Sequence, residues 1–219
     1  MKRVLGLVLV VGMCLVAVSP AFAEDAPQFT LAWSEYPSWS TFGVASNADV
    51  GLINGKAGEM GEIEKKYNVD LVLKLADYDT CLVMYGSSQV DFVCITNMDI
   101  LNPSMSRASV AILPTSTSHG ADALIVRGGI TTLDQLKGKK IFGLSKTVSE
   151  YMFYRNVILR GGNPDDFEFT NMDPGAAAMA MQQGQKGIEA IAVWNPFILQ
   201  TLNQRKFVCR TSISLPISA

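Results

Sequence analysis

A stretch of ten residues, 90–99, constrains the fold more than any other part of this sequence. It reads Val-Asp-Phe-Val-Cys-Ile-Thr-Asn-Met-Asp. The four apolar residues 92–95 are typical of a strand that is buried on both faces of a sheet. Thr96 and Asn97 follow directly, and open α/β sheets bind ligands at the carboxyl ends of their strands. The stretch therefore predicts an α/β sheet with a ligand site at Thr96 and Asn97.

The same pattern recurs near the end of the chain. Glu189 precedes the apolar run 190–193, and Trp194 and Asn195 follow it. We interpret the two copies as two similar half-sheets, each of which presents an asparagine-bearing loop to a shared cleft. The alternative is that any two buried strands of an α/β protein look alike.

The first 23 residues have the features of a secretory leader. Lys2 and Arg3 precede an apolar run over residues 4–18, and Ala21-Phe22-Ala23 ends the segment. We therefore expect a signal peptide that is cleaved after Ala23, and release of the mature chain into the periplasm. A membrane anchor is the alternative, but the apolar run is shorter than the roughly 20 residues that a span needs.

Composition excludes several function classes. Without the leader the chain has 16 basic and 20 acidic residues, a net charge of −4, and no basic patch that would indicate a nucleic-acid partner. Three cysteines remain, Cys81, Cys94 and Cys209. We expect them to be small buried apolar groups, although export would allow one pair to oxidise. One histidine and no Cys-x-x-Cys pair predict no metal site and no cofactor.

The first half of the mature chain alternates strand and helix patterns. Apolar runs bounded by turn residues predict strands, and cap residues followed by apolar periodicity predict helices. A helix over 50–67 is weakened by its four glycines. The expected strands are 29–33, 69–75, 91–95, 108–114 and 121–127, and the other expected helices are 77–85 and 98–102.

The second half repeats this plan. Thr147 and Glu150 have the spacing of a capping box at the start of a helix that runs to about residue 160. Asp173-Pro174 predicts a second helix, because an aspartate cap followed by proline is a common helix start. Asn195-Pro196 predicts a third in the same way. The expected strands are 141–144, 167–170, 189–193 and 207–213.

Two loops offer candidate binding groups. Trp33, Tyr36 and Trp39 surround the first loop, and exposed aromatic rings are unfavourable unless something covers them. These rings are either a stacking wall for a flat ligand or, for Trp39 above all, core residues under the sheet. The loop 115–120 is rich in hydroxyl groups and contains Ser118, so it is either a cradle for a polar ligand or an ordinary turn.

The order of these motifs resembles the periplasmic solute-binding proteins of ABC transporters in the nitrate/sulfonate/taurine class. Within that class, the Thr-Asn-Met-Asp and Trp-Asn-Pro words resemble most the subgroup associated with urea carboxylase gene regions. The resemblance extends over roughly residues 29–214. It rests on the segments 32–36, 91–99, 133–140 and 192–196.

The resemblance implies a two-lobed, type II periplasmic-binding-protein architecture, in which each lobe is a mostly parallel sheet flanked by helices. Residues 24–127 would form the first lobe, 128–206 the second, and 207–219 the start of a return crossover. Family members usually continue with a segment that returns to the first lobe, so we expect a chain truncated at its C-terminus. A small-molecule solute would bind in the cleft of a monomer that delivers it to a membrane permease.

The candidate ligand-binding residues come from two sources. Glu35 and Trp39 are proposed from the residue pattern of the first loop. The others are carried over from the resemblance, at strand ends and helix starts. These are Trp33, Tyr36, Thr96, Asn97, Ser118, Thr147, Ser149, Asp173, Trp194 and Asn195.

The charges near these positions favour a particular kind of solute. Helix N-termini suit anions such as nitrate, taurine or another sulfonate. Yet the candidate loops hold Glu35 and Asp173, and their only cation is Lys146. Carboxylates repel anions, so the sequence favours a urea-, amidine- or pyrimidine-like solute with N–H donors. The alternatives are a sulfonate, taurine or nitrate ligand and, for Asp173, a purely structural helix cap.

Two other function classes remain. An enzyme of the thiamine-pyrimidine synthase type shares the implied fold class, but the cysteine-rich motif of those enzymes is missing from this sequence. His119 has no evident catalytic partner in the sequence, and we expect no catalytic activity. A sensor lobe that feeds a membrane signalling protein is the third reading.

Overall fold

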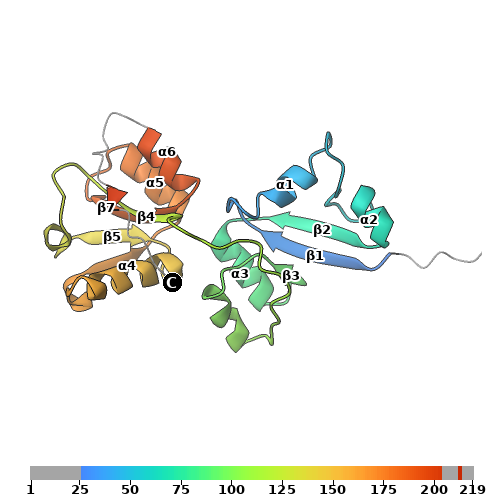
Figure 1. Cartoon of the computed structure of the whole chain (residues 1–219), viewed down its shortest axis with the longest axis horizontal. Helices are drawn as coiled ribbons and strands as arrows, with labels where there is room; N and C mark the ends of the chain where they lie inside the picture. Colours follow the sequence, from blue (N-terminus) through green and yellow to red (C-terminus); the bar gives the residue numbers. More distant parts are fainter. Residues whose placement is uncertain (1–25, 204–211, 214–219) are drawn as a thin grey trace, which may run out of the picture.

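The structure is a computed structural model that describes residues 26–203 and 212–213. Its strands form two separate sheets, one of three strands in the order β2-β1-β3 and one of five in the order β6-β5-β7-β4-β8. Figure 1 shows the two sheets side by side, each with helices on both faces. This arrangement agrees with the expected α/β class and with two half-sheets.

The first sheet is parallel throughout. Its central strand β1 (Gln28–Trp33) pairs with β2 (Asp70–Leu75) on one side and with β3 (Phe92–Val93) on the other. Helix α3 (Tyr78–Gly86) and the short helix α1 (Thr41–Ala45) lie on opposite sides of this sheet. The strand expected over 91–95 is thus present but short.

The helix expected over 50–67 is wrong for most of its length. Only its end forms a helix, α2 (Glu62–Tyr67), and residues 46–61 form turns and loops. Three glycines, Gly51, Gly55 and Gly58, adopt positive φ angles that are incompatible with an α-helix. The glycines therefore determine the backbone conformation of this segment, and its apolar residues do not make it helical.

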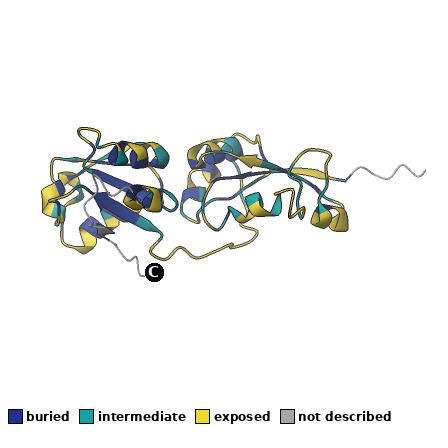
Figure 2. Ribbon diagram, turned by 90° about the horizontal axis from the view of Figure 1, so that it is seen from above, coloured by how far each residue is buried: buried dark blue, intermediate teal, exposed yellow. Residues whose placement is uncertain are grey.

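The strand expected over 108–114 is also wrong. This segment has no secondary structure, and most of its side chains are exposed, including Val110, Ile112 and Leu113. It belongs to the exposed chain that crosses between the two halves in Figure 2. The β-branched pattern requires a partner strand, and no described strand pairs with this segment. Before it, the expected short helix appears as two 3-10 turns, η1 (Asp99–Leu101) and η2 (Pro103–Met105).

The second sheet is parallel at its centre and antiparallel at one side. Parallel strands β6 (Glu168–Asn171), β5 (Lys140–Gly143) and β7 (Ala190–Trp194) lie side by side. Strand β4 (Asp122–Val126) runs antiparallel to β7 and to β8 (Ser212–Ile213). Strand β4 therefore belongs to the second sheet, although the first lobe was expected to extend to residue 127. The remainder of the strand expected over 207–213 lies outside the described residues.

Helices cover both faces of the second sheet. Figure 1 shows α5 (Pro174–Gln182) and α6 (Phe197–Asn203) over one face and α4 (Val148–Leu159) over the other. Alternate residues of the strands fill two apolar cores, because successive strand side chains point to opposite faces. Ile191 and Val193 pack under α5 and α6, whereas Ala190 and Ala192 lie in the core that includes Phe153 of α4.

All three helices predicted in the second half are present, and α6 begins at Phe197, directly after Asn195-Pro196. The predicted caps of the other two have different outcomes. The Asp173 carboxylate accepts a hydrogen bond from the Ala176 backbone N–H at 2.8 Å, so the predicted cap of α5 is confirmed. The capping box at α4 is wrong. The Thr147 hydroxyl donates to the Leu144 carbonyl at 2.7 Å, and Glu150 accepts from the Lys146 amide.

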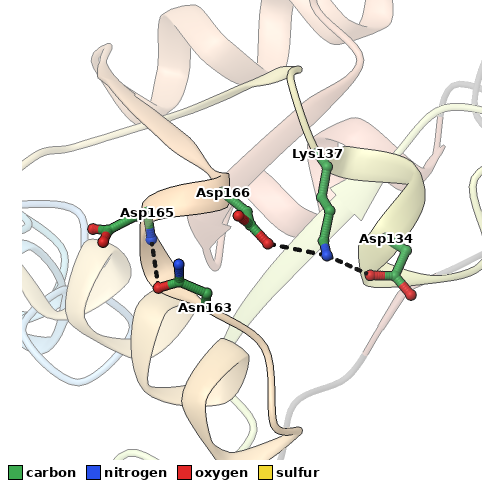
Figure 3. Close-up of polar contacts among 5 residues, drawn as sticks. All are labelled: Asp134, Lys137, Asn163, Asp165 and Asp166. Atoms are coloured by element: carbon green, nitrogen blue, oxygen red, sulfur yellow. Dashed lines mark hydrogen bonds and ion pairs between the residues drawn. The ribbon is translucent and has the colours of Figure 1, made fainter.

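A lysine connects two 3-10 turns beside the second sheet. Lys137 follows η3 (Leu133–Leu136), and its amine lies 3.1 Å from the Asp134 carboxylate and 3.0 Å from the carboxylate of Asp166 in η4 (Pro164–Asp166) (Figure 3). All three side chains are at least partly exposed, so these ion pairs contribute little to stability. Lys137, the first lysine of the Leu-Lys-Gly-Lys-Lys segment, therefore forms surface ion pairs within the second half of the chain.

Cys81 and Cys94 are free and buried, as predicted, and Cys209 lies outside the described residues. Within residues 26–203 and 212–213, no cluster of histidine, cysteine and carboxylate side chains is suited to a metal ion. None of the helices described here combines the length and apolar character that crossing a bilayer requires.

Candidate functional site

A pocket lies between the two sheets and takes its walls from both. Its space between atoms, about 260 Å³, includes open solvent, so it is a small open cleft rather than an enclosed cavity. The first half contributes groups from its loops and from α3, and the second half contributes the starts of β4 and α4 and the end of β7. The lining residues are Tyr36, Tyr78, Thr96, Asp99, Asp122, Thr147, Val148, Ser149 and Trp194.

A row of aromatic rings forms one side of this pocket. Tyr36 packs on Trp39 with ring centroids 4.5 Å apart, and Trp39 stacks on Tyr78 at 5.8 Å. Tyr78 then meets Trp194 of the second sheet edge-on at 5.9 Å. Edge-on and offset ring pairs are favourable arrangements. The row therefore joins the two halves through the contact between Tyr78 and Trp194.

A hydrogen-bonded group from the first half faces the pocket. The Tyr78 hydroxyl donates to the Asp99 carboxylate at 2.8 Å and accepts from the Thr96 backbone N–H at 3.1 Å. The Thr96 hydroxyl accepts from the Asp99 backbone N–H at 3.1 Å. Burial, with the nearby Asp99 charge, raises the pKa of Tyr78 well above its usual range. Tyr78 is therefore a neutral donor that holds Asp99 in place.

A second carboxylate, Asp122, enters the pocket from the start of β4. The Ser149 hydroxyl donates to it at 3.4 Å. Burial, together with the nearby charge of Asp99, raises the pKa of Asp122 to about 6, although the hydrogen bond from Ser149 acts in the opposite direction. Burial also raises the pKa of Asp99, and hydrogen bonds from Tyr78 and Thr96 lower it. The pocket thus holds two carboxylates, the buried Asp99 and the half-buried Asp122, that resist ionising together.

Helix α4 begins at the pocket, close to these two carboxylates. Thr147 and Ser149 are buried there, and the Val148 backbone N–H lies close enough to Asp99 to lower the pKa of that carboxyl. Free N–H groups give a helix start partial positive charge. A carboxylate from the first half therefore complements a helix start in the second half.

Five of the residues predicted from the sequence line this pocket: Tyr36, Thr96, Thr147, Ser149 and Trp194.

Two more lie beside it. The Ser118 hydroxyl shares a hydrogen bond with the Tyr36 hydroxyl at 3.1 Å, and Trp39 supports the ring of Tyr36 from behind. Trp39 is buried, and its indole N–H donates to the Thr115 hydroxyl at 3.2 Å. Whether any of the seven contacts a ligand stays a prediction.

The other five predicted residues lie outside the pocket lining. Trp33 is buried in the core, where it packs so closely on Gly43 that a Cβ there would lie 2.8 Å from the indole ring. Glu35 and Asn97 are exposed, and Asp173 caps α5. Asn195 is half-buried, and its side-chain oxygen is buried without a hydrogen-bond partner.

Four lining residues were missed by the sequence analysis: Tyr78, Asp99, Asp122 and Val148. Asp99 is the last residue of the organising stretch, so its position after a strand end was a usable signal. Asp122 begins a strand, where a single acidic residue is common and carries no distinctive pattern. Tyr78 had no signal, because it lies in the first turn of a helix and reaches the pocket only through the packing of that helix on the sheet.

Comparison with solved structures identifies the architecture. The alkanesulfonate-binding protein SsuA of Xanthomonas axonopodis pv. citri, bound to MOPS, superimposes with a TM-score of 0.65 at 17% identity, over 85% of this chain and 62% of that one. The periplasmic aliphatic sulphonate-binding protein SsuA of Escherichia coli gives 0.61 at 16% identity, over 85% and 60%. This chain has the periplasmic-binding-protein fold.

Other neighbours agree with that architecture. The ligand-binding component of an ABC-type import system from Staphylococcus aureus, with zinc bound, gives a TM-score of 0.61 at 10% identity, over 85% of this chain and 60% of that one. The chain thus spans about three fifths of the length of these structures. No protein-family model and no curated protein matches the sequence.

Proposed function

We propose that this chain is the extracytoplasmic solute-binding component of an ABC importer, and that it binds a small nitrogen-containing solute of the urea, amidine or pyrimidine type. The observation that carries the proposal is the pocket between the two sheets, whose walls combine two carboxylates, three hydroxyl-bearing side chains of Ser or Thr, and aromatic rings. One structural neighbour is named as the ligand-binding component of an ABC-type import system and two as sulfonate-binding proteins, and these names support the same role.

The chemistry of the lining favours N–H donors. Asp99 and Asp122 are acceptors when ionised, and Trp194 and Tyr78 offer flat faces or edges to a planar solute. Among the described residues that line the pocket there is no lysine, arginine or histidine. Lys146, the cation of the candidate loops, is exposed and outside the lining.

A sulfonate, taurine or nitrate ligand is the second candidate. The N-terminus of α4 favours it, because helix starts bind anions, and so do the names of two neighbours. Such an anion would have to displace or neutralise Asp99, which lies next to the Val148 amide. This cost makes the nitrogen-containing solute the better fit.

The remaining parts of the proposal follow from the transport role. A leader cleaved after Ala23 would deliver the mature chain to the periplasm as a monomer, where a membrane permease receives the solute. The first sheet with its helices would form one lobe and the second sheet, from β4 on, the other, and the solute would favour their closed arrangement, as in other hinge-closing proteins. We assign no catalysis, since His119 is exposed and does not line the pocket.

A thermal-shift screen of the mature chain tests this function. The compounds are urea, guanidine, pyrimidines, taurine, alkanesulfonates and nitrate. A ligand at about 100 times its Kd stabilises a protein by roughly 2.7 kcal/mol, which is a clear rise in Tm. We expect a rise with nitrogen-containing compounds. A rise with sulfonates alone supports the second candidate, and no rise with any compound contradicts solute binding.

A pair of tyrosine variants locates the site. Tyr78→Phe removes the hydroxyl that holds Asp99, whereas Tyr67→Phe makes the same change on an exposed ring of α2. Both variants are first shown to melt cooperatively. The ligand-induced rise in Tm should shrink in Tyr78→Phe and stay unchanged in Tyr67→Phe. Equal rises in the two variants would place the binding site elsewhere.

A further inference from the structure

One carboxylate oxygen of Asp99 makes no hydrogen bond of normal geometry within the described residues. The residue is 3% exposed, and one carboxylate oxygen accepts from Tyr78 at 2.8 Å. The other oxygen is buried and has no hydrogen-bond partner. A buried unpaired acceptor is unfavourable, and more so when it carries charge. Because Asp99 also lines the pocket, a solute that donates a hydrogen bond can satisfy this oxygen.

Asp122, the second carboxylate of the pocket, also favours a solute that donates hydrogen bonds. Asp122 also lines the pocket, and its described partner is the Ser149 hydroxyl at a long 3.4 Å. The other titratable groups of the lining, Tyr36 and Tyr78, are phenols, which carry no positive charge in either protonation state, and burial raises their pKa values so that they stay neutral. The lining therefore carries negative charge that no described side chain in it neutralises.

The start of α4 does not offset this charge for an incoming anion. Asp99 already lies beside the Val148 amide, so the protein's own carboxylate uses the partial positive charge of the helix start. An anionic solute at the same place would meet Asp99 and Asp122 in a partly desolvated pocket. Like charges that close together repel strongly where water is excluded.

We infer that Asp99 and Asp122 select a small, planar, positively charged solute of the amidinium class, and that Asp99 is the specificity-determining residue that excludes anions. This inference rests on the proposed function and narrows its solute. Amidinium N–H groups fit carboxylate oxygens as donors, and charge-assisted bonds of this kind are the strong ones. Tyr78 and Trp194 also line the pocket, and aromatic rings attract cations.

Three probes of nearly identical shape separate charge from fit: acetamidinium, acetamide and acetate. Their Kd values are measured by calorimetry on the mature chain at about pH 7.5, where a carboxyl with a pKa near 6 is mostly ionised. We expect acetamidinium to bind at least about tenfold more tightly than acetamide, because a buried charge pair outweighs a neutral hydrogen bond. Acetate should not compete.

Two matched variants assign the selection to the pocket. Asp99→Asn keeps the shape and removes the charge, so the preference for acetamidinium over acetate should fall at least about tenfold. Asp165→Asn removes the same charge from an exposed residue outside the pocket and should leave all three Kd values unchanged. Cooperative melting of each variant shows that it is folded.

Several results would overturn the inference. Acetate binding as tightly as acetamidinium to the unaltered chain would do so, and so would an unchanged preference in Asp99→Asn. Failure of all three probes would overturn the amidinium class. The thermal screen then decides the function separately, because a rise in Tm with sulfonates keeps a solute-binding protein while rejecting cation selection.

Discussion

At the residue scale, two carboxylates make the pocket negatively charged, and the sequence analysis named neither of them. Asp99 and Asp122 are held there by Tyr78 and Ser149, and burial raises the pKa of both carboxyls. The sequence analysis expected acidic groups near the solute but named Glu35 and Asp173. Both of these are exposed and lie outside the pocket lining.

The raised pKa of Asp122 makes the stability of the fold depend on pH. The carboxyl has a pKa of about 6 when folded, against 3.8 for the unperturbed group, so the folded chain binds an extra proton between these values. The free energy of unfolding therefore falls as pH rises from about 4 to about 6. Asp122→Asn lacks this loss. As pH rises between those values, we expect the free energy of unfolding of the variant to increase by about 1–3 kcal/mol relative to that of the unaltered chain.

Urea denaturation across this pH range measures the effect. The difference in free energy of unfolding between Asp122→Asn and the unaltered chain should grow as pH rises and level off above about pH 6. A difference that stays constant with pH, or shrinks, would show that Asp122 is not buried next to Asp99 as described.

At the element scale, the sequence predicted helices and strands well where local signals and packing agree. The pattern of alternating apolar residues gave β2, and the aspartate–proline start gave α5. Residues 108–114 have the local pattern of a strand without a partner, and residues 50–61 have glycines that override an apolar pattern. Pairing and positive φ angles depend on the rest of the chain, so a local reading misses them.

Helix α2 is attached to the first sheet by one buried carboxylate. Glu64 accepts backbone hydrogen bonds from Asn54 at 2.6 Å, Gly61 at 2.7 Å and Leu71 at 2.9 Å. Glu64→Gln would place an amide donor against backbone donors, and we expect a loss of roughly 2–3 kcal/mol in the free energy of unfolding. The exposed Glu62→Gln on the same helix should cost less than about 1 kcal/mol.

Chemical denaturation of the two glutamine variants makes this comparison under identical conditions. Because the two changes are the same and differ only in burial, a similar cost for both would contradict the structural role of Glu64.

Variants of Asp173 can distinguish its structural role as the cap of α5 from a contact with the ligand. Asp173→Ala removes the acceptor for the Ala176 amide and should cost about 1 kcal/mol, whereas Asp173→Asn keeps an acceptor and should cost little. Neither change should alter the Kd of a solute, since Asp173 lies outside the pocket lining. Thermal melts and calorimetric titrations of both variants measure the two effects. A large change in Kd would return Asp173 to the binding site.

At the scale of the whole molecule, the repeated strand-and-loop pattern correctly indicated two half-sheets. A pocket lies between them, but the two asparagines of the pattern, Asn97 and Asn195, are outside its lining. The pattern predicted Thr96 and Trp194 at the strand ends that meet there. The sequence did not indicate that β4 joins the second sheet, because antiparallel pairing with β7 leaves no local mark. The exact set of pocket residues likewise depends on how α3 and α4 pack, which the local pattern does not encode.

The measurement that tests the central claim most directly is hydrogen exchange with and without the solute that stabilises the chain most in the thermal screen. A solute held between the two sheets should slow exchange at once in segments of both halves, around Thr96–Asp99 in the first and around Val148–Ser149 and Trp194 in the second. Protection confined to one half, or centred outside these segments, would contradict a binding site between the sheets.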